Sequence, residues 1–424
     1  MNIFLQGGDV AYEEGPLQRA DVWIQDGMIK AVAPGLSIPE KAKVIDCAGK
    51  IVMPGMFDAH VHFREPGQEA KETILDGTEA AINGGITGVV MMPNTAPAID
   101  SATVVKRVLE AGEQCRIPVL TSGCITVGRK GLEMAGIEGM KKAGVLMLTD
   151  DGDAVPNAAL LKRAMEYARE FGMFFASHCE LEELAGPRAL NEGPVSYRLG
   201  IPGTPALAEE MCMDRDIRLS HATQTPLHIQ HVSSGIGMET IRWWRDTMGA
   251  PVSGEVSPHH LMFRDEDIGD YDTHYKMNPP LRTAEDNAAL LQGLKDGVFR
   301  IIATDHAPHT EFEKQQAFVE APNGITGLDT AVVSLFDRFI RTGEFGWDLL
   351  VKRYSAEPRR MMELDVAEVA EGQKADLIVF DPQGETHFTK EFMKSKSSNT
   401  PFLNQTLHGS VDTVILGDEI LLER

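Results

Sequence analysis

Short apolar runs alternate with amphipathic stretches through the middle of the chain. The runs are rich in β-branched and aromatic residues, which is typical of buried strands. The stretches between them, such as residues 69–83 and 158–171, place apolar residues at helical spacing. Repeated strand and helix units predict an α/β fold with a parallel sheet. About eight units fit between residues 54 and 365, and polar residues end several strands, so a closed (β/α)8 TIM-type barrel is favoured over an open sheet.

The two ends of the chain have a different pattern. The N-terminal part contains short alternating segments separated by Gly, Pro and Asp turns, which is typical of a small β-rich unit. Residues 374–382 and 410–423 have the same character, with Gly417 and Asp418 as a hairpin turn. The predicted boundaries are a β-rich segment at 1–53, a barrel at 54–365 and a second β-rich segment at 366–424.

Composition and charge narrow the class of protein. A chain of 424 residues that is 43% hydrophobic can bury a large core. Its net charge of −23 would repel nucleic acid and anionic membranes, so we expect neither as a partner. The 5 cysteines are an odd number without CxxC spacing and indicate reduced thiols. With no leader pattern and no apolar run long enough to span a bilayer, a cytoplasmic protein is expected.

The first candidate for chemistry is a histidine pair that follows the apolar residues 50–57. In an extended segment His60 and His62 would lie on the same face, about 6.6 Å apart, close enough to share one metal ion. Arg64 continues that face. A His-x-His pair alone is also common in structural positions, so the prediction needs further ligands.

Further ligand-type residues end other apolar runs. His178, His231 and Asp305 each follow one, and the pair Asp150 and Asp151 follows another. Because the carboxyl ends of barrel strands share one face, these residues predict a single site. Imidazole and carboxylate donors favour a divalent metal, with zinc first and manganese or cobalt as substitutes. In a regular strand the two adjacent acids cannot both face the site, and spacing alone does not choose between them.

The ordered set of motifs resembles the class I dihydroorotases of the amidohydrolase superfamily, nearly from end to end. The segments that carry the resemblance are DAHVHFREPG at 58–67, MMPNTAP at 91–97, LTDDG at 148–152, ASHCE at 176–180, HVS at 231–233, SPHHL at 257–261, KMNPPLR at 276–282, ATDHAPH at 303–309 and GITG at 324–327. The resemblance implies that the two ends of the chain pair into one small β-sandwich beside the barrel. It also implies a homodimer, and it allows association with aspartate transcarbamoylase.

The resemblance implies a centre of two zinc ions per chain. The implied ligands are His60 and His62 for one ion, His178 and His231 for the second, Asp151 as the bridge, and Asp305 completing the shell of the first ion. Many members of the superfamily bridge the ions with a carboxylated lysine, but the strand here has no lysine. The members that this chain resembles use an aspartate instead.

The implied activity is the reversible cyclisation of N-carbamoyl-L-aspartate to L-dihydroorotate plus water, a step of de novo pyrimidine biosynthesis. A zinc-activated bridging hydroxide would attack the ring amide, with Asp305 as general acid and base. The alternative that Asp305 is a metal ligand with no role in proton transfer stays open. The implied substrate contacts are His62, Arg64, Asn94, Asn278, His309, Asn323 and Gly324. Some close relatives carry an aromatic residue in place of Asn323, so the backbone contact at Gly324 is the firmer expectation. His259 and His260 are expected to pack around the site.

Two other functions stay open at this point. One is a different cyclic amidohydrolase, a hydantoinase or allantoinase, which the missing lysine and the carboxylate-binding set disfavour. The other is a non-catalytic dihydroorotase-like scaffold of aspartate transcarbamoylase. Such scaffolds usually lose metal ligands, whereas all six are present here.

Overall fold

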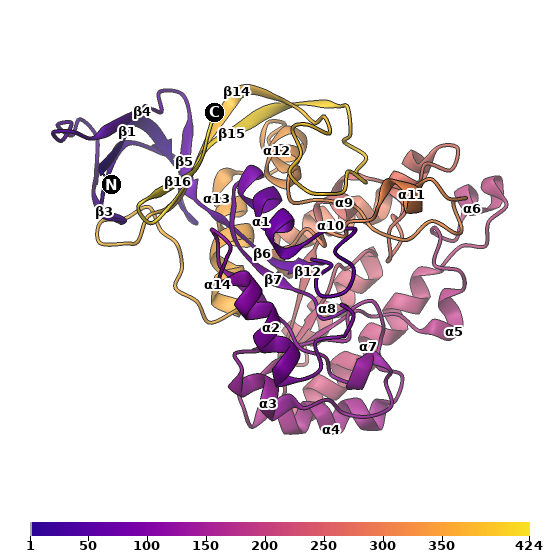
Figure 1. The fold of residues 1–424 in the computed structure, drawn as a ribbon. Coiled ribbons are helices and arrows are strands. Elements are labelled where there is room, and N and C mark those ends of the chain that lie inside the picture. The colour runs from indigo at the N-terminus through magenta and orange to yellow at the C-terminus, as the bar shows by residue number, and fades with distance from the viewer. Residues whose placement is uncertain (1) are drawn as a thin grey trace.

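The middle of the chain folds into a closed parallel barrel (Figure 1). The computed structural model describes residues 2–424. The barrel strands, in chain order, are β6 (Met56–Val61), β7 (Ile86–Met91), β8 (Val119–Thr121), β9 (Met147–Leu148), β10 (Phe174–Ser177), β11 (Leu227–Ile229), β12 (Val252–Val256) and β13 (Phe299–Ile302). They form a three-stranded and a five-stranded sheet. Parallel bridges from Gly123 to Leu148 and from Val61 to His306 close the ring. The predicted barrel is confirmed.

Helices connect the strands and cover the outside of the barrel (Figure 1). They are α1 (Ile74–Asn83), α2 (Ala102–Gly112), α3 (Ile137–Lys142), α4 (Ala158–Arg169), α5 (Glu182–Ala185), α6 (Pro194–Leu199), α7 (Ala206–Thr223), α8 (Gly235–Asp246), α9 (Pro258–Met262), α10 (Ala284–Lys295), α11 (Glu311–Lys314), α12 (Ala331–Leu335), α13 (Trp347–Val351) and α14 (Glu357–Met361). Within residues 2–424, none of the helices is long and apolar enough to span a bilayer.

Local capping explains where two expected helices begin. Residues 69–83 were expected to be helical, but α1 begins only at Ile74 because Thr73 caps it and accepts a hydrogen bond from the backbone N–H of Asp76. The preceding residues form a loop beside the strand ends. The second expected helix begins as predicted, at Ala158, where the Asn157 side chain accepts the free backbone N–H groups.

The two ends of the chain join in one sheet outside the barrel, as expected (Figure 1). Its strands are β1 (Asn2–Val10), β2 (Gln18–Gln25), β3 (Met28–Ala33), β4 (Lys43–Asp46), β5 (Ile51–Pro54), β14 (Asp376–His387), β15 (Thr406–Leu416) and β16 (Glu419–Glu423). The junction is the antiparallel pairing of β5 with β14, which places Val52 opposite Val379. Gly417 and Asp418 form the predicted turn between β15 and β16. The sheet buries its own apolar cluster, which includes Val52 and Val379.

Alternate strand positions fill the interior of the barrel. Phe57 and Ala59 of β6 pack with Val90 of β7, Phe174 of β10 and Ile301 of β13 in one buried cluster. The strand period of two residues brings these side chains to the same inner surface. The interior is therefore packed, and the candidate ligands gather at the carboxyl ends of the strands.

Candidate active site

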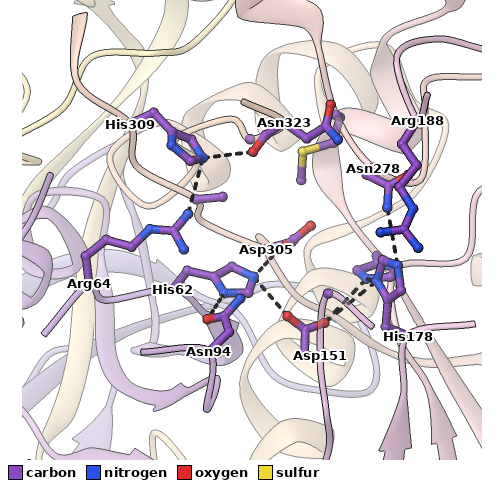
Figure 2. Close-up of a pocket in the computed structure, with 15 residues that line it drawn as sticks. His62, Arg64, Asn94, Asp151, His178, Arg188, Asn278, Asp305, His309 and Asn323 are labelled. Atoms are coloured by element: carbon purple, nitrogen blue, oxygen red, sulfur yellow. Dashed lines mark hydrogen bonds and ion pairs between the residues drawn. The ribbon is translucent and has the colours of Figure 1, made fainter. Parts of the chain in front are cut away.

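Six ligand-type side chains from five strand ends meet in one buried cluster (Figure 2). They are His60 and His62 from β6, Asp151 after β9, His178 after β10, His231 after β11 and Asp305 after β13. The strand alternation brings the first two rings together, with centroids 5.2 Å apart. An adjoining cavity of about 230 Å³ is lined by every other residue implied for the site, together with Gly152, Arg188, Met277 and Ala307.

Asp151 lies at the centre of the cluster. Its Oδ1 is 3.5 Å from His60 Nε2 and 3.6 Å from His231 Nε2, and its Oδ2 is 3.3 Å from His62 Nε2. His178 Nδ1 lies 3.9 Å from the same Oδ1. One carboxylate thus faces all four imidazoles, which is the arrangement that a bridge between two cations requires.

Asp150 points away from the cluster. Its Oδ1 accepts the backbone N–H groups of Ile125 and Thr126 at 2.8 and 3.1 Å, and its Oδ2 accepts the Thr126 hydroxyl. Burial raises the pKa of this carboxyl, against the lowering effect of these hydrogen bonds. Asp150 therefore anchors the loop after β8, and of these two adjacent acids it is Asp151 that faces the imidazoles.

The donor atoms of the cluster fit a metal ion. His60 Nε2 and Asp151 Oδ1 are buried and have no hydrogen-bond partner among residues 2–424. Burial alone would lower the pKa of His60, but Glu255, Asp151 and Asp305 raise it well above its usual value. Buried acids that stabilise a protonated imidazole also stabilise a divalent cation that is bound to the imidazole in place of the proton. The residues therefore suit imidazole and carboxylate coordination.

Glu255 of β12 orients the ligands, and sequence reasoning did not identify it. Its Oε1 is 2.5 Å from His60 Nδ1 and accepts the backbone N–H of His231 at 3.1 Å, while Oε2 is 3.1 Å from His228 Nε2. A carboxylate at His60 Nδ1 holds the proton there and leaves Nε2 free for coordination. The only sequence signal was an acid inside a short strand that begins and ends with valine.

Two of the candidate ligands have strained backbone conformations. His231 has φ 32° and Asp305 has φ 49°, values in the left-handed region that L-residues rarely adopt. Such strain persists only where surrounding contacts impose it, and it is frequent at functional sites. Both residues leave their strands through this turn and direct their side chains into the cluster.

Arg64 is buried on one side of the cavity without an anionic partner. It is 8% exposed, and its Nε donates to the Pro308 carbonyl at 3.1 Å. Its Nη2 lies 3.4 Å from His309 Nε2, and no acid of residues 2–424 forms a salt bridge with Arg64. Burial lowers the pKa of Arg64 to about 10, which still leaves the guanidinium charged at neutral pH. A buried, unpaired guanidinium is costly unless an anion binds there.

His309 and Asn94 flank this guanidinium with polar atoms. His309 Nε2–H donates to the Asn323 carbonyl at 2.8 Å, and its Nδ1 lies 3.3 Å from Lys71 Nζ. Burial, with Arg64 and Lys71 nearby, lowers the pKa of His309 well below its usual value, so the ring is neutral. His62 Nδ1 lies 2.9 Å from Asn94 Oδ1. An anion at Arg64 would compete with the Asn323 carbonyl for the His309 proton.

Two buried lysines hold the loop that carries Asn323 and Gly324, and sequence reasoning missed both. Lys276 Nζ donates to the Val319 carbonyl at 2.8 Å and to the Ala321 carbonyl at 2.5 Å. Lys314 Nζ donates to the carbonyls of Pro322 and Gly324 at 3.0 and 3.2 Å.

The tight fit of this loop also explains the glycine at its end. Gly324 donates its N–H to the Lys276 carbonyl at 2.9 Å. It has φ 149°, and a Cβ there would lie 2.7 Å from the Ala307 carbonyl oxygen and 2.8 Å from His309 Cδ2. Only glycine fits this wall of the cavity.

The opposite side of the cavity contains Asn278 and Arg188 (Figure 2). Asn278 Nδ2 lies 3.4 Å from Glu180 Oε2 and 3.3 Å from His178 Nε2, while its Oδ1 is buried without a partner among the described residues. Arg188 was absent from the sequence prediction because it lies in an irregular connection between α5 and α6, where no periodicity marks it.

His259 and His260 lie beside the site in α9. Ser257 Oγ and the Pro279 carbonyl contact the two ring nitrogens of His260 at 2.7 and 2.9 Å. Burial lowers the pKa of His259 to about 4. These neighbours keep His260 in a packing position, and neither ring belongs to the ligand clusters of the described residues.

Comparison with known sequences identifies close relatives. A family model described as "Dihydro-orotase-like" matches residues 49–236. The protein "Dihydroorotase" of Brevibacillus brevis is 41% identical over 428 residues, covering 100% of both chains. The "Dihydroorotase" of Carboxydothermus hydrogenoformans is 39% identical over 411 residues, covering 96% of this chain and 95% of the relative.

Solved structures share the fold at lower sequence identity. The L-hydantoinase (dihydropyrimidinase) of Arthrobacter aurescens superposes with a TM-score of 0.88 at 22% identity, covering 100% of this chain and 96% of the other. The dihydropyrimidinase of Brevibacillus agri gives a TM-score of 0.86 at 22% identity, covering 100% and 95%. At this identity the solved structures show only the fold. The relatives at 39% and 41% identity show the family, and the chain belongs to the dihydroorotase family.

Proposed function

We propose that this cavity catalyses the reversible cyclisation of N-carbamoyl-L-aspartate to L-dihydroorotate and water, the activity that its relatives' name denotes. The observation that carries the proposal is the buried, unpaired guanidinium of Arg64 beside a cluster of metal-ligand side chains. Dihydroorotate bears a ring amide and a carboxylate, and the two parts of the cavity match these groups. A hydantoin or dihydrouracil ring offers no carboxylate to neutralise Arg64.

The donor set supports two zinc ions per chain. His60, His62 and Asp305 would hold one ion, His178 and His231 the other, and Asp151 would bridge them. Imidazole nitrogen and carboxylate oxygen are ligands that zinc accepts in catalytic sites. Bound there, the ions would polarise the reacting carbonyl and lower the pKa of water towards 7.

Asp305 would carry the proton of the reaction. In the hydrolytic direction an attacking water oxygen forms a bond to the ring carbonyl carbon, and the bond from that carbon to the ring nitrogen breaks. The Asp305 carboxylate accepts the proton that the water loses and donates it to the leaving nitrogen. His62 Nε2 lies 2.8 Å from Asp305 Oδ1, close enough for the two groups to bind the same ion. Ring closure follows the same steps in reverse.

The substrate contacts divide between the two sides of the cavity. Arg64 would bind the carboxylate that both substrate forms retain, because its planar guanidinium matches a carboxylate in a bidentate way. Asn94 and His309 would add hydrogen bonds to that carboxylate. On the other side, the free Oδ1 of Asn278 would accept from an amide N–H, and Asn323 with Gly324 would form the wall.

The substrate preference of the zinc-loaded wild-type protein tests the proposal. We expect hydrolysis of L-dihydroorotate with a higher kcat/KM than that of dihydrouracil, hydantoin or allantoin. A faster reaction with one of the three neutral rings would contradict the assignment and favour another cyclic amidohydrolase. Inactivity on all four rings with both ions bound would favour a non-catalytic scaffold.

Arg64→Ala should reduce kcat/KM for dihydroorotate far more than for neutral dihydrouracil. Loss of a charge-assisted bidentate contact typically costs about 2 to 5 kcal/mol, or roughly 30-fold to several thousand-fold. Steady-state kinetics with both substrates and a zinc determination check this result. Arg64→Lys retains the charge but loses the bidentate geometry, and should recover only part of the effect. Equal losses with both substrates would indicate damage to the metal centre instead.

Assembly forms a separate part of the proposal. The family resemblance favours a homodimer and a cytoplasmic enzyme that can associate with aspartate transcarbamoylase, the source of carbamoyl aspartate. Light scattering of the purified protein measures its oligomeric state, and the same measurement on a mixture with the transcarbamoylase detects association.

A further inference from the structure

His306, the residue after Asp305, has a fully buried ring with a partner at each nitrogen. Its Nε2 lies 2.8 Å from Oε1 of Glu72, which is also fully buried. The backbone N–H groups of Gly327 and Leu328 donate to its Nδ1 at 3.1 and 3.3 Å. Because backbone N–H groups only donate, Nδ1 is the unprotonated nitrogen, and the proton on Nε2 is donated to Glu72. These contacts fix both the tautomer and the orientation of the ring.

The partners of the His306 ring come from different parts of the chain. Glu72 belongs to the loop between β6 and α1, whereas Gly327 and Leu328 belong to the segment before α12. The second oxygen of Glu72, Oε2, accepts the hydroxyl of Ser395 from the connection between β14 and β15. The ring is therefore held by segments that follow both β6 and β13, the two strands at which the barrel closes.

The backbone of His306 is held as firmly as its side chain. Its carbonyl accepts the His62 N–H at 2.8 Å, and its N–H donates to Thr304 Oγ1 at 3.2 Å. The φ of 49° at the preceding residue, Asp305, is a conformation that persists only where surrounding contacts impose it. Fixing residue 306 thus keeps the Asp305 carboxylate directed into the ligand cluster (Figure 2).

From this geometry we infer that Glu72 is a positioning residue, which acts through the His306 ring to hold Asp305 where its carboxylate exchanges a proton with the reacting atoms. The inference rests on the proposed function, in which Asp305 carries the proton. Glu72 does not itself line the cavity, so it would affect turnover without contacting the substrate.

A second effect of Glu72, on Arg64, has to be separated from this one. Burial lowers the pKa of Arg64, and Glu72 is the nearby acid that most opposes this lowering. Any neutral replacement of Glu72 removes the same charge from the surroundings of Arg64, and so should change KM for an anionic substrate equally. Loss of the hydrogen bond from His306 should instead lower kcat, and only where the replacement cannot accept that bond.

The test therefore compares Glu72→Met with Glu72→Gln. In Glu72→Met the Nε2–H of His306 loses its acceptor, and kcat on dihydroorotate should fall roughly ten- to a hundred-fold, as expected when a reacting group is misplaced by about 1 Å. In Glu72→Gln the amide oxygen still accepts the proton, so kcat should stay within about three-fold of wild type. Zinc content should equal that of wild type in both variants, and KM should change equally in both.

Two further measurements distinguish positioning from general damage. The solvent isotope effect on kcat should increase in Glu72→Met, because a misplaced Asp305 makes proton transfer a larger part of the barrier. In the Asp305→Asn background, Glu72→Met should reduce kcat by less than about two-fold, because residues that act as one unit are not additive.

Ser395→Ala provides a matched control on the same acid. It removes the hydroxyl that donates to Glu72 Oε2 and leaves Oε1 with His306. The kcat, the solvent isotope effect and the zinc content of this variant should therefore equal those of wild type.

Specific outcomes would overturn the inference. These are an unchanged kcat in Glu72→Met, an equal loss in Glu72→Gln, a fall in zinc content that accounts for the loss, or a full additive loss in the Asp305→Asn background. Each can occur while wild type still hydrolyses dihydroorotate. Inactivity of wild type on dihydroorotate would instead contradict the proposed function.

Discussion

Asp151→Ala should lower zinc content below two ions per chain and reduce kcat on dihydroorotate by at least about a thousand-fold. The carboxylate lies within 3.9 Å of a nitrogen of all four histidines, so its loss removes the acid that faces the ligands of both ions. Without the bridge the two cations also lose the negative charge that allows them to lie close together. Metal analysis and steady-state kinetics on the same preparation measure both effects.

The neighbouring acid provides the matched control. Asp150→Asn keeps an oxygen that can accept the N–H groups of Ile125 and Thr126, so zinc content and kcat should stay near those of wild type. Asp150→Ala would leave these buried donors without an acceptor, at about 1 to 3 kcal/mol each, and should lower the melting temperature. Inactivation by Asp150→Asn with a tolerated Asp151→Ala would show that the bridge is assigned to the wrong acid.

The aspartate bridge also predicts how the apo-protein regains activity. A carboxylated lysine needs carbon dioxide, whereas a carboxylate side chain does not. Zinc alone should therefore restore activity in bicarbonate-free buffer, and a bicarbonate requirement would contradict an aspartate bridge.

Asp305→Asn should reduce kcat by roughly a hundred- to ten-thousand-fold, the usual contribution of a positioned acid or base. The amide keeps an oxygen for the metal but cannot accept and return a proton. In wild type, burial alone would raise the pKa of Asp305, but His60 and His62 lower it to about 2, so the carboxylate is ready to accept a proton at neutral pH.

Zinc titration separates the two roles of Asp305. If Asp305 carries the proton, the activity of Asp305→Asn should stay low even when excess metal restores the zinc content. Full recovery of kcat with excess zinc would show that Asp305 acts as a ligand only.

The strand-end residues were predictable because strand geometry is regular. Alternation of side chains along β6 sufficed to place His60 and His62 on one face, and the barrel brought the ends of β10, β11 and β13 to the same side. The order of apolar runs predicted the barrel for the same reason. These inferences need only local periodicity and the rule that parallel strands end at one edge.

Residues outside regular structure could not be placed in this way. Strand β9 ends at Leu148, so alternation no longer applies at Asp150 and Asp151, and hydrogen bonds to the loop after β8 decide which acid turns inward. Glu255 lies within its strand and not at the end, which hid its contact with His60. The position of the Arg188 side chain depends on a tertiary contact with Glu180, which the spacing of residues in the sequence does not reveal.

The closure of the barrel links catalysis to the order in which the chain is made. The seam joins β6 to the segment after β13, through the hydrogen bond from His62 N–H to the His306 carbonyl at 2.8 Å. The first two ligands leave the ribosome early, and Asp305, on the other side of the seam, follows only after the intervening strands. A nascent or truncated chain therefore cannot assemble the complete ligand set, and activity appears only once the ring has closed.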